Sequence, residues 1–253
     1  IGIILKTSTD KLTFRAVLAV TSALLVFPLI WAVEFPPREA LGFLAAGAAI
    51  HFFYQLSQIS AFERGDMSLV YPIMRGASPA LAAIFACLVL GETLGPISLI
   101  GLFLSAGALI GFGWPKKVHS NAQRNGAREA VGFALLCAVM IALYSVIDAA
   151  GMRAARTELG QVWSYMVWFF VLDCVLITPL AIYRRRRNLK HAIARELKWG
   201  AIAGVFSLLT FGLALYAFSI APVAQMSAVR ETSVVFGAIF AAKVLKEPLG
   251  MRR

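Results

Sequence analysis

The sequence predicts an all-α integral membrane protein built from two repeats of transmembrane helices. Of its 253 residues, 60% are hydrophobic and 15% are charged, whereas soluble domains are about 45 to 50% apolar and about 25% charged. Long apolar segments recur along the chain, and one stretch of the first half returns in the second half. A chain with this much apolar surface needs a bilayer as its solvent.

Eight segments are apolar over the roughly 20 residues that a helix needs to cross about 30 Å of hydrocarbon. The expected spans lie near 16–33, 40–62, 67–90, 96–114, 129–151, 162–182, 199–220 and 223–245. Runs of about ten alternating apolar and polar residues, the mark of transmembrane strands, do not recur. Because several connections are only a few residues long, consecutive helices are expected to be antiparallel neighbours.

One stretch of sequence occurs twice. Residues 75–95 align with residues 230–250 at a constant offset of 155 (230 − 75), and eleven aligned positions are identical. The polar and glycine matches are Arg75 with Arg230, Ser78 with Ser233, Glu92 with Glu247, and Gly95 with Gly250. Chance similarity between apolar helices accounts for shared Ala, Val and Leu but not for these matches. We therefore interpret the two halves as copies of one unit.

Each unit is expected to contain five helices. The first unit continues after Gly95 into the span 96–114, whereas three residues follow Gly250, and the apolar residues 1–5 resemble the stump of an earlier helix. We therefore expect ten helices in the parent protein, eight of them complete here. The expected divisions are a first repeat at 1–114 that lacks most of its first helix, a basic linker at 115–128, and a second repeat at 129–253 that lacks its last helix. Because five is odd, the second copy enters the membrane from the opposite side, so the repeats are inverted.

Two blocks and the five-plus-five plan resemble the EamA-type drug/metabolite transporter (DMT) superfamily. The blocks are GDMSLVYPIMRGASPALAAIFACLVLGETLG at 65–95 and APVAQMSAVRETSVVFGAIFAAKVLKEPLG at 221–250. In that family such a helix ends in a Gly-Glu or Lys-Glu step, matched here by Gly91-Glu92 and Lys246-Glu247, and the next helix is glycine-rich, matched by Gly101, Gly107 and Gly111. The resemblance implies a transporter with a central cavity between two halves of opposite orientation and with alternating access.

Two arginines lie inside predicted spans at equivalent places in the two repeats. A cation at such depth costs at least about 2.5 to 3.5 kcal/mol, so Arg75 and Arg230 each require a polar cavity or a partner. Tyr71 lies one turn before Arg75 on the same helix face, and Glu231 follows Arg230. We expect these residues to bind a substrate that carries an anionic group. The alternative is that the arginines reach the interface or form structural ion pairs.

A polar stripe marks the predicted helix at 40–62. His51, Tyr54, Gln55 and Gln58 are spaced i, i+3, i+4 and i+7, which places them on one face of the helix. Such a face needs protein or water around it. The stripe either lines the substrate pathway or forms a hydrogen-bonded seam between helices, in which each contact is worth about 0.6 kcal/mol.

Acidic and aromatic residues in later spans add to the candidate site. Tyr144 and Asp148 lie one turn apart near 129–151, and Asp173 lies in the next span. A carboxylate inside a membrane span is a candidate proton carrier, because the bilayer disfavours its charged form. We predict that Tyr144 contacts substrate and that Asp148 couples transport to protons, and we interpret Asp173 as structural.

The net charge of +11 is concentrated between the apolar segments. If the spans alternate, the basic stretches 6–15, 116–128 and 184–198 share one side, which the positive-inside rule makes cytoplasmic. This placement indicates contact with anionic headgroups rather than with nucleic acid. The expected location is the plasma membrane (the bacterial inner membrane), with multiple passes. Gly107 with Gly111 and Gly200 with Gly204 have a small-xxx-small spacing that we interpret as packing, with a homodimer interface as the alternative.

The function that these patterns favour is transport. The sequence has no HExxH, GxSxG or Walker motif and no Cys/His ligand cluster, so no enzyme, metal site or cofactor is expected. We expect a secondary active transporter that moves a small polar or anionic metabolite, of the amino acid or organic acid type, by alternating access, with proton coupling as a hypothesis. The alternatives are a multidrug or cation exporter of the same superfamily and a non-transporting membrane scaffold. A cation site would present an unpaired carboxylate among aromatic residues.

Overall fold

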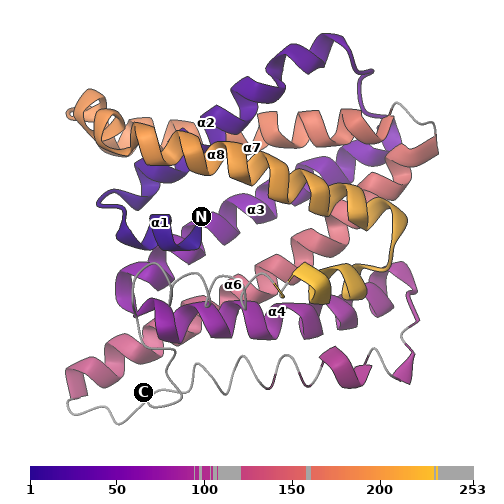
Figure 1. Cartoon of the computed structure of the whole chain (residues 1–253), viewed down its shortest axis with the longest axis horizontal. Coiled ribbons are helices and arrows are strands. Elements are labelled where there is room, and N and C mark those ends of the chain that lie inside the picture. Colours follow the sequence, from indigo (N-terminus) through magenta and orange to yellow (C-terminus); the bar gives the residue numbers. More distant parts are fainter. Residues whose placement is uncertain are drawn as a thin grey trace.

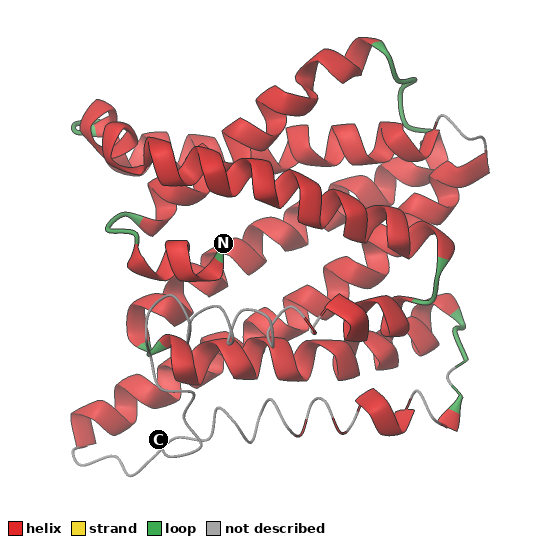
Figure 2. Ribbon diagram, viewed as in Figure 1, coloured by secondary structure: helices red, strands yellow, loops and turns green. Residues whose placement is uncertain are grey.

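The computed structural model describes residues 1–93, 95, 96, 99–102, 104, 107, 121–157, 161–230 and 232. All regular structure within these residues is helical (Figure 2). The helices are α1 (Gly2–Thr7), α2 (Lys11–Val26), η1 (Phe27–Trp31), α3 (Arg38–Arg64), α4 (Met67–Leu90), α6 (Asn121–Ala154), η2 (Ala155–Thr157), α7 (Gln161–Arg185) and α8 (Leu189–Ile220). A further helical segment begins at Val223 and is described as far as Arg230.

Six helices among the described residues are long and apolar enough to cross a membrane. They are Lys11–Trp31, Arg38–Arg64, Leu69–Leu90, Gly126–Ala154, Val162–Arg185 and Leu189–Ile220. Each coincides with one of the eight spans predicted from the sequence. The other two predicted spans, 96–114 and 223–245, lie largely outside the described residues. The all-α membrane fold is therefore confirmed.

Helices α6 and α8 begin well before the apolar segments that predicted them, and α2 begins at Lys11 instead of near 16. Helix α8 begins at Leu189 instead of near 199, and α6 begins at Asn121, inside the stretch 115–128 that was expected to be a linker. Hydropathy detects only the part of a helix that lies in hydrocarbon. The residues LKHAIARELK at 189–198 favour helix through their Ala, Leu, Lys, Arg and Glu, so the helix continues beyond the bilayer core.

The packing of the helices follows the inverted repeat. Shifting α3 by the repeat offset of 155 places it at 193–219, inside α8, and the same shift places α2 inside α7. Helix α2 packs against α8, α3 packs against α7, and α2 packs against α7. When the two repeats are exchanged, α2 changes places with α7, and α3 changes places with α8. The α2–α8 contact then becomes the α7–α3 contact, and the α2–α7 contact stays the same. Figure 1 shows α2, α7 and α8 on one side of α3, with α4 and α6 on the other.

Close contact between α2 and α8 depends on two glycines. A Cβ on Gly200 would lie 2.7 Å from Val17 Cγ1, and a Cβ on Gly204 would lie 2.7 Å from the Leu18 carbonyl oxygen. The approach allows Ser22 Oγ to donate a hydrogen bond of 2.9 Å to the Gly204 carbonyl. This glycine pair therefore serves packing between the two repeats. Gly111, the second member of the other pair, lies outside the described residues.

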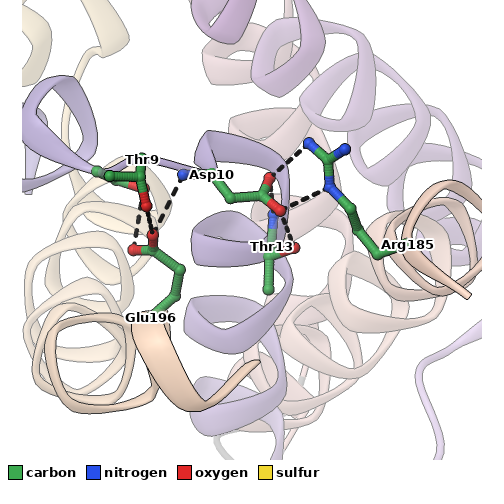
Figure 3. Close-up of polar contacts among 6 residues, drawn as sticks. Thr9, Asp10, Thr13, Arg185 and Glu196 are labelled. Atoms are coloured by element: carbon green, nitrogen blue, oxygen red, sulfur yellow. Dashed lines mark hydrogen bonds and ion pairs between the residues drawn. The ribbon is translucent and has the colours of Figure 1, made fainter. Parts of the chain in front are cut away.

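A polar network joins the connections at one end of the bundle (Figure 3). Asp10 caps α2 by accepting from Thr13 N, and its two carboxylate oxygens also accept from Arg185 Nε (2.6 Å) and Nη2 (3.1 Å). Glu196, which is buried, accepts from Ser8 Oγ and Thr9 Oγ1 at 2.9 Å each. The α1–α2 and α7–α8 connections therefore meet, and the basic stretches 6–15 and 184–198 lie on the same side.

Two further contacts bring the α3–α4 connection to this basic end. Lys6 Nζ donates to the carbonyls of Phe62 (2.7 Å) and Gly65 (2.8 Å) at the C-terminal end of α3. The negative end of the helix dipole also stabilises a cation at this place. Arg64 pairs with Glu129 near the start of α6 at 3.3 Å. The start of α6 therefore lies at the basic end as well.

The Asp10–Arg185 pair predicts a pH-dependent stability. Burial alone would raise the Asp10 pKa, but the hydrogen bonds from Arg185 and Thr13 outweigh burial and hold the pKa below its usual value. A depressed carboxyl pKa stabilises the folded state above the unfolded pKa of about 4, and this contribution is lost as the pH falls through the folded value. We expect the melting temperature of wild type to exceed that of Asp10→Asn by a constant difference from about pH 5 to pH 8. This difference should become smaller below about pH 4. Melting curves that keep the same difference at every pH would contradict this ion pair.

The opposite end of the bundle is joined by a second polar network. Glu92 follows Gly91, which ends α4 in the left-handed conformation with a φ of 64°. The Glu92 carboxylate accepts from Arg153 Nη2 at 2.5 Å and from the backbone N–H of Val223 at 2.9 Å. It therefore caps the helical segment that begins at Val223. The Gly-Glu step of the first repeat thus holds the equivalent helix of the second.

Candidate functional site

A cluster of buried polar side chains lies halfway along the spans. His51 is at the middle of the span Arg38–Arg64, and Asp173 is at the middle of the span Val162–Arg185. Asp173 Oδ1 accepts hydrogen bonds from His51 Nδ1 at 2.7 Å and from Gln55 Nε2 at 2.6 Å. The side chains of His51 and Asp173 are only 12% and 8% exposed. Helices α3 and α7, one from each repeat, are therefore joined by a hydrogen bond between titratable side chains at the centre of the bundle.

Aromatic rings from four positions surround His51. Its imidazole stacks on Phe211 of α8 with ring centroids 5.3 Å apart. It also meets the edges of Tyr144 of α6 (5.2 Å) and Phe169 of α7 (5.4 Å). Tyr54 lies 5.4 Å from the same imidazole. The cluster is therefore a polar centre with aromatic walls, built by four helices.

The polar stripe of α3 faces the interior of the bundle, as its spacing indicates. Tyr54, Gln55 and Gln58 are buried, and Gln58 Nε2 donates to the Tyr54 hydroxyl at 2.8 Å. The amide oxygens Gln55 Oε1 and Gln58 Oε1 have no hydrogen-bond partner among the residues that the structure describes. The stripe therefore forms part of a hydrogen-bonded seam with α7 through Gln55 and also leaves two buried acceptors without a partner among the described residues.

Asp148 forms a second carboxylate site beside the first. It is fully buried, and its Oδ1 accepts from the Tyr165 hydroxyl at 3.0 Å. Its Oδ2 has no hydrogen-bond partner within the described part of the chain. Asp148 and Asp173 are close enough to interact electrostatically. The residue that the sequence predicts to couple protons therefore lies near the central cluster.

Two glycines make room for the Asp148–Tyr165 pair. A Cβ on Gly47 of α3 would overlap Asp148 Oδ1, and a Cβ on Gly151 of α6 would overlap the Tyr165 ring. The pair therefore fits only because α3 and α6 have no side chain at these two positions.

The two embedded arginines approach the cluster from α4 and from the segment that begins at Val223. The Arg75 guanidinium lies 5.7 Å from the centre of the Tyr71 ring. The charges of Arg75 and Arg230 both act electrostatically on the Tyr144 hydroxyl. Both side chains are partly buried rather than fully exposed. Glu231, the predicted partner of Arg230, lies outside the described residues.

Some residues of the site do not stand out in the sequence. Tyr165, Phe169 and Asp173 are spaced by four residues along one face of α7, a signal that a search of that helix for periodicity would have found. Asp173, which was interpreted as structural, accepts hydrogen bonds from both His51 and Gln55. Arg15 was counted with the cations of a connection, but it is a helical residue that is 6% exposed.

The chemistry of the cluster suits binding of a polar solute. It offers hydrogen-bond donors, acceptors and charges of both signs between aromatic walls, which is how small-molecule sites fix orientation and exclude water. Its residues come from helices of both repeats, as in transporters that bind substrate near the bilayer midplane at the repeat interface.

Comparison with known proteins agrees with this geometry. The model of the EamA-like transporter family matches residues 2–114 and 129–253. The two matched segments cover nearly the whole chain and divide it between the two repeats. None of the curated proteins matches the sequence significantly.

Proposed function

This chain belongs to the EamA-like transporter family, and on that premise we propose that it is a secondary active transporter of the plasma membrane. Its substrate would be a small polar or anionic metabolite of the amino acid or organic acid type. The substrate would bind at the central cluster and be exposed to the two sides of the membrane in turn.

The main support is the set of buried polar atoms without partners. Gln55 Oε1, Gln58 Oε1 and Asp148 Oδ2 lie inside the bundle and lack hydrogen-bond partners among the described residues. A buried polar group without a partner costs about 1 to 3 kcal/mol. A polar solute that enters the cluster would form hydrogen bonds with these atoms. In a membrane scaffold that binds no solute, the same atoms would only lower the stability of the protein.

The polar networks at the two ends support alternating access. Asp10 with Arg185 closes the basic end, and Glu92 with Arg153 closes the other end. Each network joins elements of both repeats, so rocking of one repeat against the other would have to break one network at a time. In this scheme Arg75 and Arg230 attract the anionic group toward the cluster, while Tyr54, Tyr71, Tyr144, His51, Gln55 and Glu231 provide polar contacts.

Proton coupling would use the buried carboxylates. Asp148 is our first choice, because its Oδ2 is not engaged by the described residues and Tyr165 holds its Oδ1. Protonation of a carboxylate in this environment removes a charge that the bilayer disfavours. The Asp148→Asn variant would then exchange substrate without responding to a pH gradient.

A second candidate is an exporter of organic cations. It is favoured by the aromatic rings of Tyr54, Tyr144, Phe169 and Phe211 around the His51–Asp173 pair, since cations bind over aromatic faces. The hydrogen bonds that Asp173 already accepts from His51 and Gln55, together with the nearby arginine charges, argue against it.

Uptake into proteoliposomes tests both candidates. The full-length protein would be offered labelled L-leucine, L-glutamate, succinate and tetraphenylphosphonium, with and without a pH gradient. We expect saturable uptake of at least one of the carboxylates, and stimulation by the gradient in wild type but not in Asp148→Asn. Saturable uptake of tetraphenylphosphonium alone would favour the cation exporter. No saturable uptake of any of the four compounds would refute the proposed function.

A further inference from the structure

Arg15 is a buried cation at the basic end of the bundle. It lies one turn inside α2, where the span Lys11–Trp31 begins, and is 6% exposed. Its guanidinium lies over the Tyr54 ring, 5.8 Å from the centroid. Its Nε has no hydrogen-bond partner among residues 1–93, 121–157 and 161–230 or at the other described positions. A guanidinium is always charged and has five N–H donors to satisfy.

The surroundings of Arg15 are mostly apolar. Phe14, Leu18, Tyr54, Cys137 and Ile141 belong to the hydrophobic cluster at this end of the bundle. The Cys137 thiol is the titratable group of α6 on which the Arg15 charge acts. A cation buried in such surroundings without an acid is costly.

Three other arginines at the ends of the bundle have acidic partners, and Arg156 donates to the Ser219 carbonyl. Arg64 pairs with Glu129, Arg153 with Glu92, and Arg185 with Asp10. No ion pair of Arg15 occurs within the part of the chain that the structure describes. A structural role would predict an acid beside Arg15, so its isolation points to an anion that is not part of the described chain.

Next to Arg15, α3 offers further polar atoms. Gln58 lies one turn of α3 beyond Tyr54, donates to the Tyr54 hydroxyl through Nε2, and keeps Oε1 without a partner among the described residues. The Tyr54 ring also lies 5.4 Å from the imidazole of His51. Arg15, Tyr54 and Gln58 therefore lie between the central cluster and the basic end, with Tyr54 common to both places.

We infer that Arg15, Tyr54 and Gln58 form an anion subsite that holds a carboxylate of the transported compound as it passes between the central cluster and the basic end. The inference rests on the proposed transport function. The guanidinium donates to the carboxylate, which provides charge-assisted hydrogen bonds. Gln58 Oε1 accepts from a hydroxyl or ammonium group next to that carboxylate.

The test uses benzoate as the anionic probe and benzamide as its neutral counterpart. Thermal melting of the purified full-length protein would be measured for wild type, Arg15→Met, Arg15→Lys and the control Arg64→Met. Arg64 is a suitable control because its guanidinium also lies over an aromatic ring, 4.8 Å from the centre of Phe133, but has an acidic partner. Without ligand, we expect Arg15→Met to melt at the same temperature as wild type or above it, because a costly buried charge has been removed.

Ligand binding separates this subsite from a structural arginine. Benzoate, but not benzamide, is expected to raise the melting temperature of wild type and Arg64→Met, to do so weakly in Arg15→Lys, and to have no effect in Arg15→Met. For a carboxylate that wild type transports, Arg15→Met should raise KM about 10- to 100-fold, the loss expected for a hydrogen bond to a charged group. An Arg15→Met protein that melts well below wild type, or a benzoate shift that is absent from wild type or unchanged by Arg15→Met, would overturn the inference.

The same data distinguish failure of the subsite from failure of the proposed function. If wild type carries no solute into proteoliposomes but binds benzoate through Arg15, the transport proposal falls, and with it the role of Arg15 in passage, while anion binding at Arg15 stands. If transport of a carboxylate is saturable and Arg15→Met leaves its KM unchanged, the transport proposal stands and the subsite falls.

Discussion

Replacing Asp173 with Asn is expected to reduce transport by about 10- to 100-fold, because a hydrogen bond to a charged group is worth about 1.5 to 3 kcal/mol and the carboxylate holds two side chains of the site. Asp173 Oδ1 accepts from both His51 and Gln55 at 2.7 and 2.6 Å. Asparagine keeps the size of the side chain but removes its charge, so His51 loses the group that orients its ring. Initial rates of uptake in proteoliposomes, corrected for the amount of inserted protein, measure the effect.

The control for this variant is Glu129→Gln. Glu129 also pairs with a basic residue, Arg64, but its side chain is 65% exposed at the end of the bundle. Exposed pairs of this kind contribute about 0 to 1 kcal/mol, so transport should stay near the wild-type rate. Asp173→Asn protein that inserts normally and transports at the wild-type rate would remove Asp173 from the site.

Gly47→Ala is expected to destabilise the protein by about 1 to 3 kcal/mol, the usual cost of overpacking a filled interior. The added methyl group would overlap Asp148 Oδ1, so either α3 moves away from α6 or the Asp148–Tyr165 hydrogen bond breaks. Transport should fall as well, because the same shift displaces the stripe of α3. Thermal melting and uptake would be measured on the same preparations.

Gly42→Ala provides a matched control in the same helix. A Cβ on Gly42 meets nothing within 4 Å, and in a helix interior alanine is favoured over glycine by up to about 1 kcal/mol. Gly42→Ala should therefore be neutral or stabilising. If both substitutions had the same effect on the melting temperature, the close approach of α3 and α6 at Gly47 would be wrong.

Much of the fold can be predicted from hydropathy and from the internal repeat. The segment expected at 40–62 is α3 at Arg38–Arg64, and the segment expected at 67–90 is α4 at Met67–Leu90. These spans are predictable because the length of an apolar segment is set by the thickness of the bilayer. The start of α8 at Leu189 is not, since five of its first ten residues are charged or histidine, and this part of the helix follows helix propensity rather than hydropathy.

The candidate site is predictable only where it depends on one helix. The positions of His51, Tyr54, Gln55 and Gln58 on one face follow from the geometry of α3 alone. The hydrogen bond from His51 to Asp173 depends on how α3 packs against α7, and local sequence patterns do not encode that packing. Arg15 was missed for a different reason: the apolar segment begins at residue 16, whereas the Asp10 cap starts the helix at Lys11.

The most direct test of the central claim is access of water to the cluster from the two sides of the membrane. A single-cysteine protein would carry Gln55→Cys after replacement of Cys87, Cys137 and Cys174, and would be exposed to a membrane-impermeant thiol reagent from one side at a time. Leu209→Cys is the control, because Leu209 is 55% exposed on the surface of α8, where it would face lipid. The account predicts that Gln55→Cys reacts from both sides, at rates that change when a transported compound is added, while Leu209→Cys stays unreactive. Protection of Gln55→Cys from both sides under all conditions would contradict a polar passage between the two repeats.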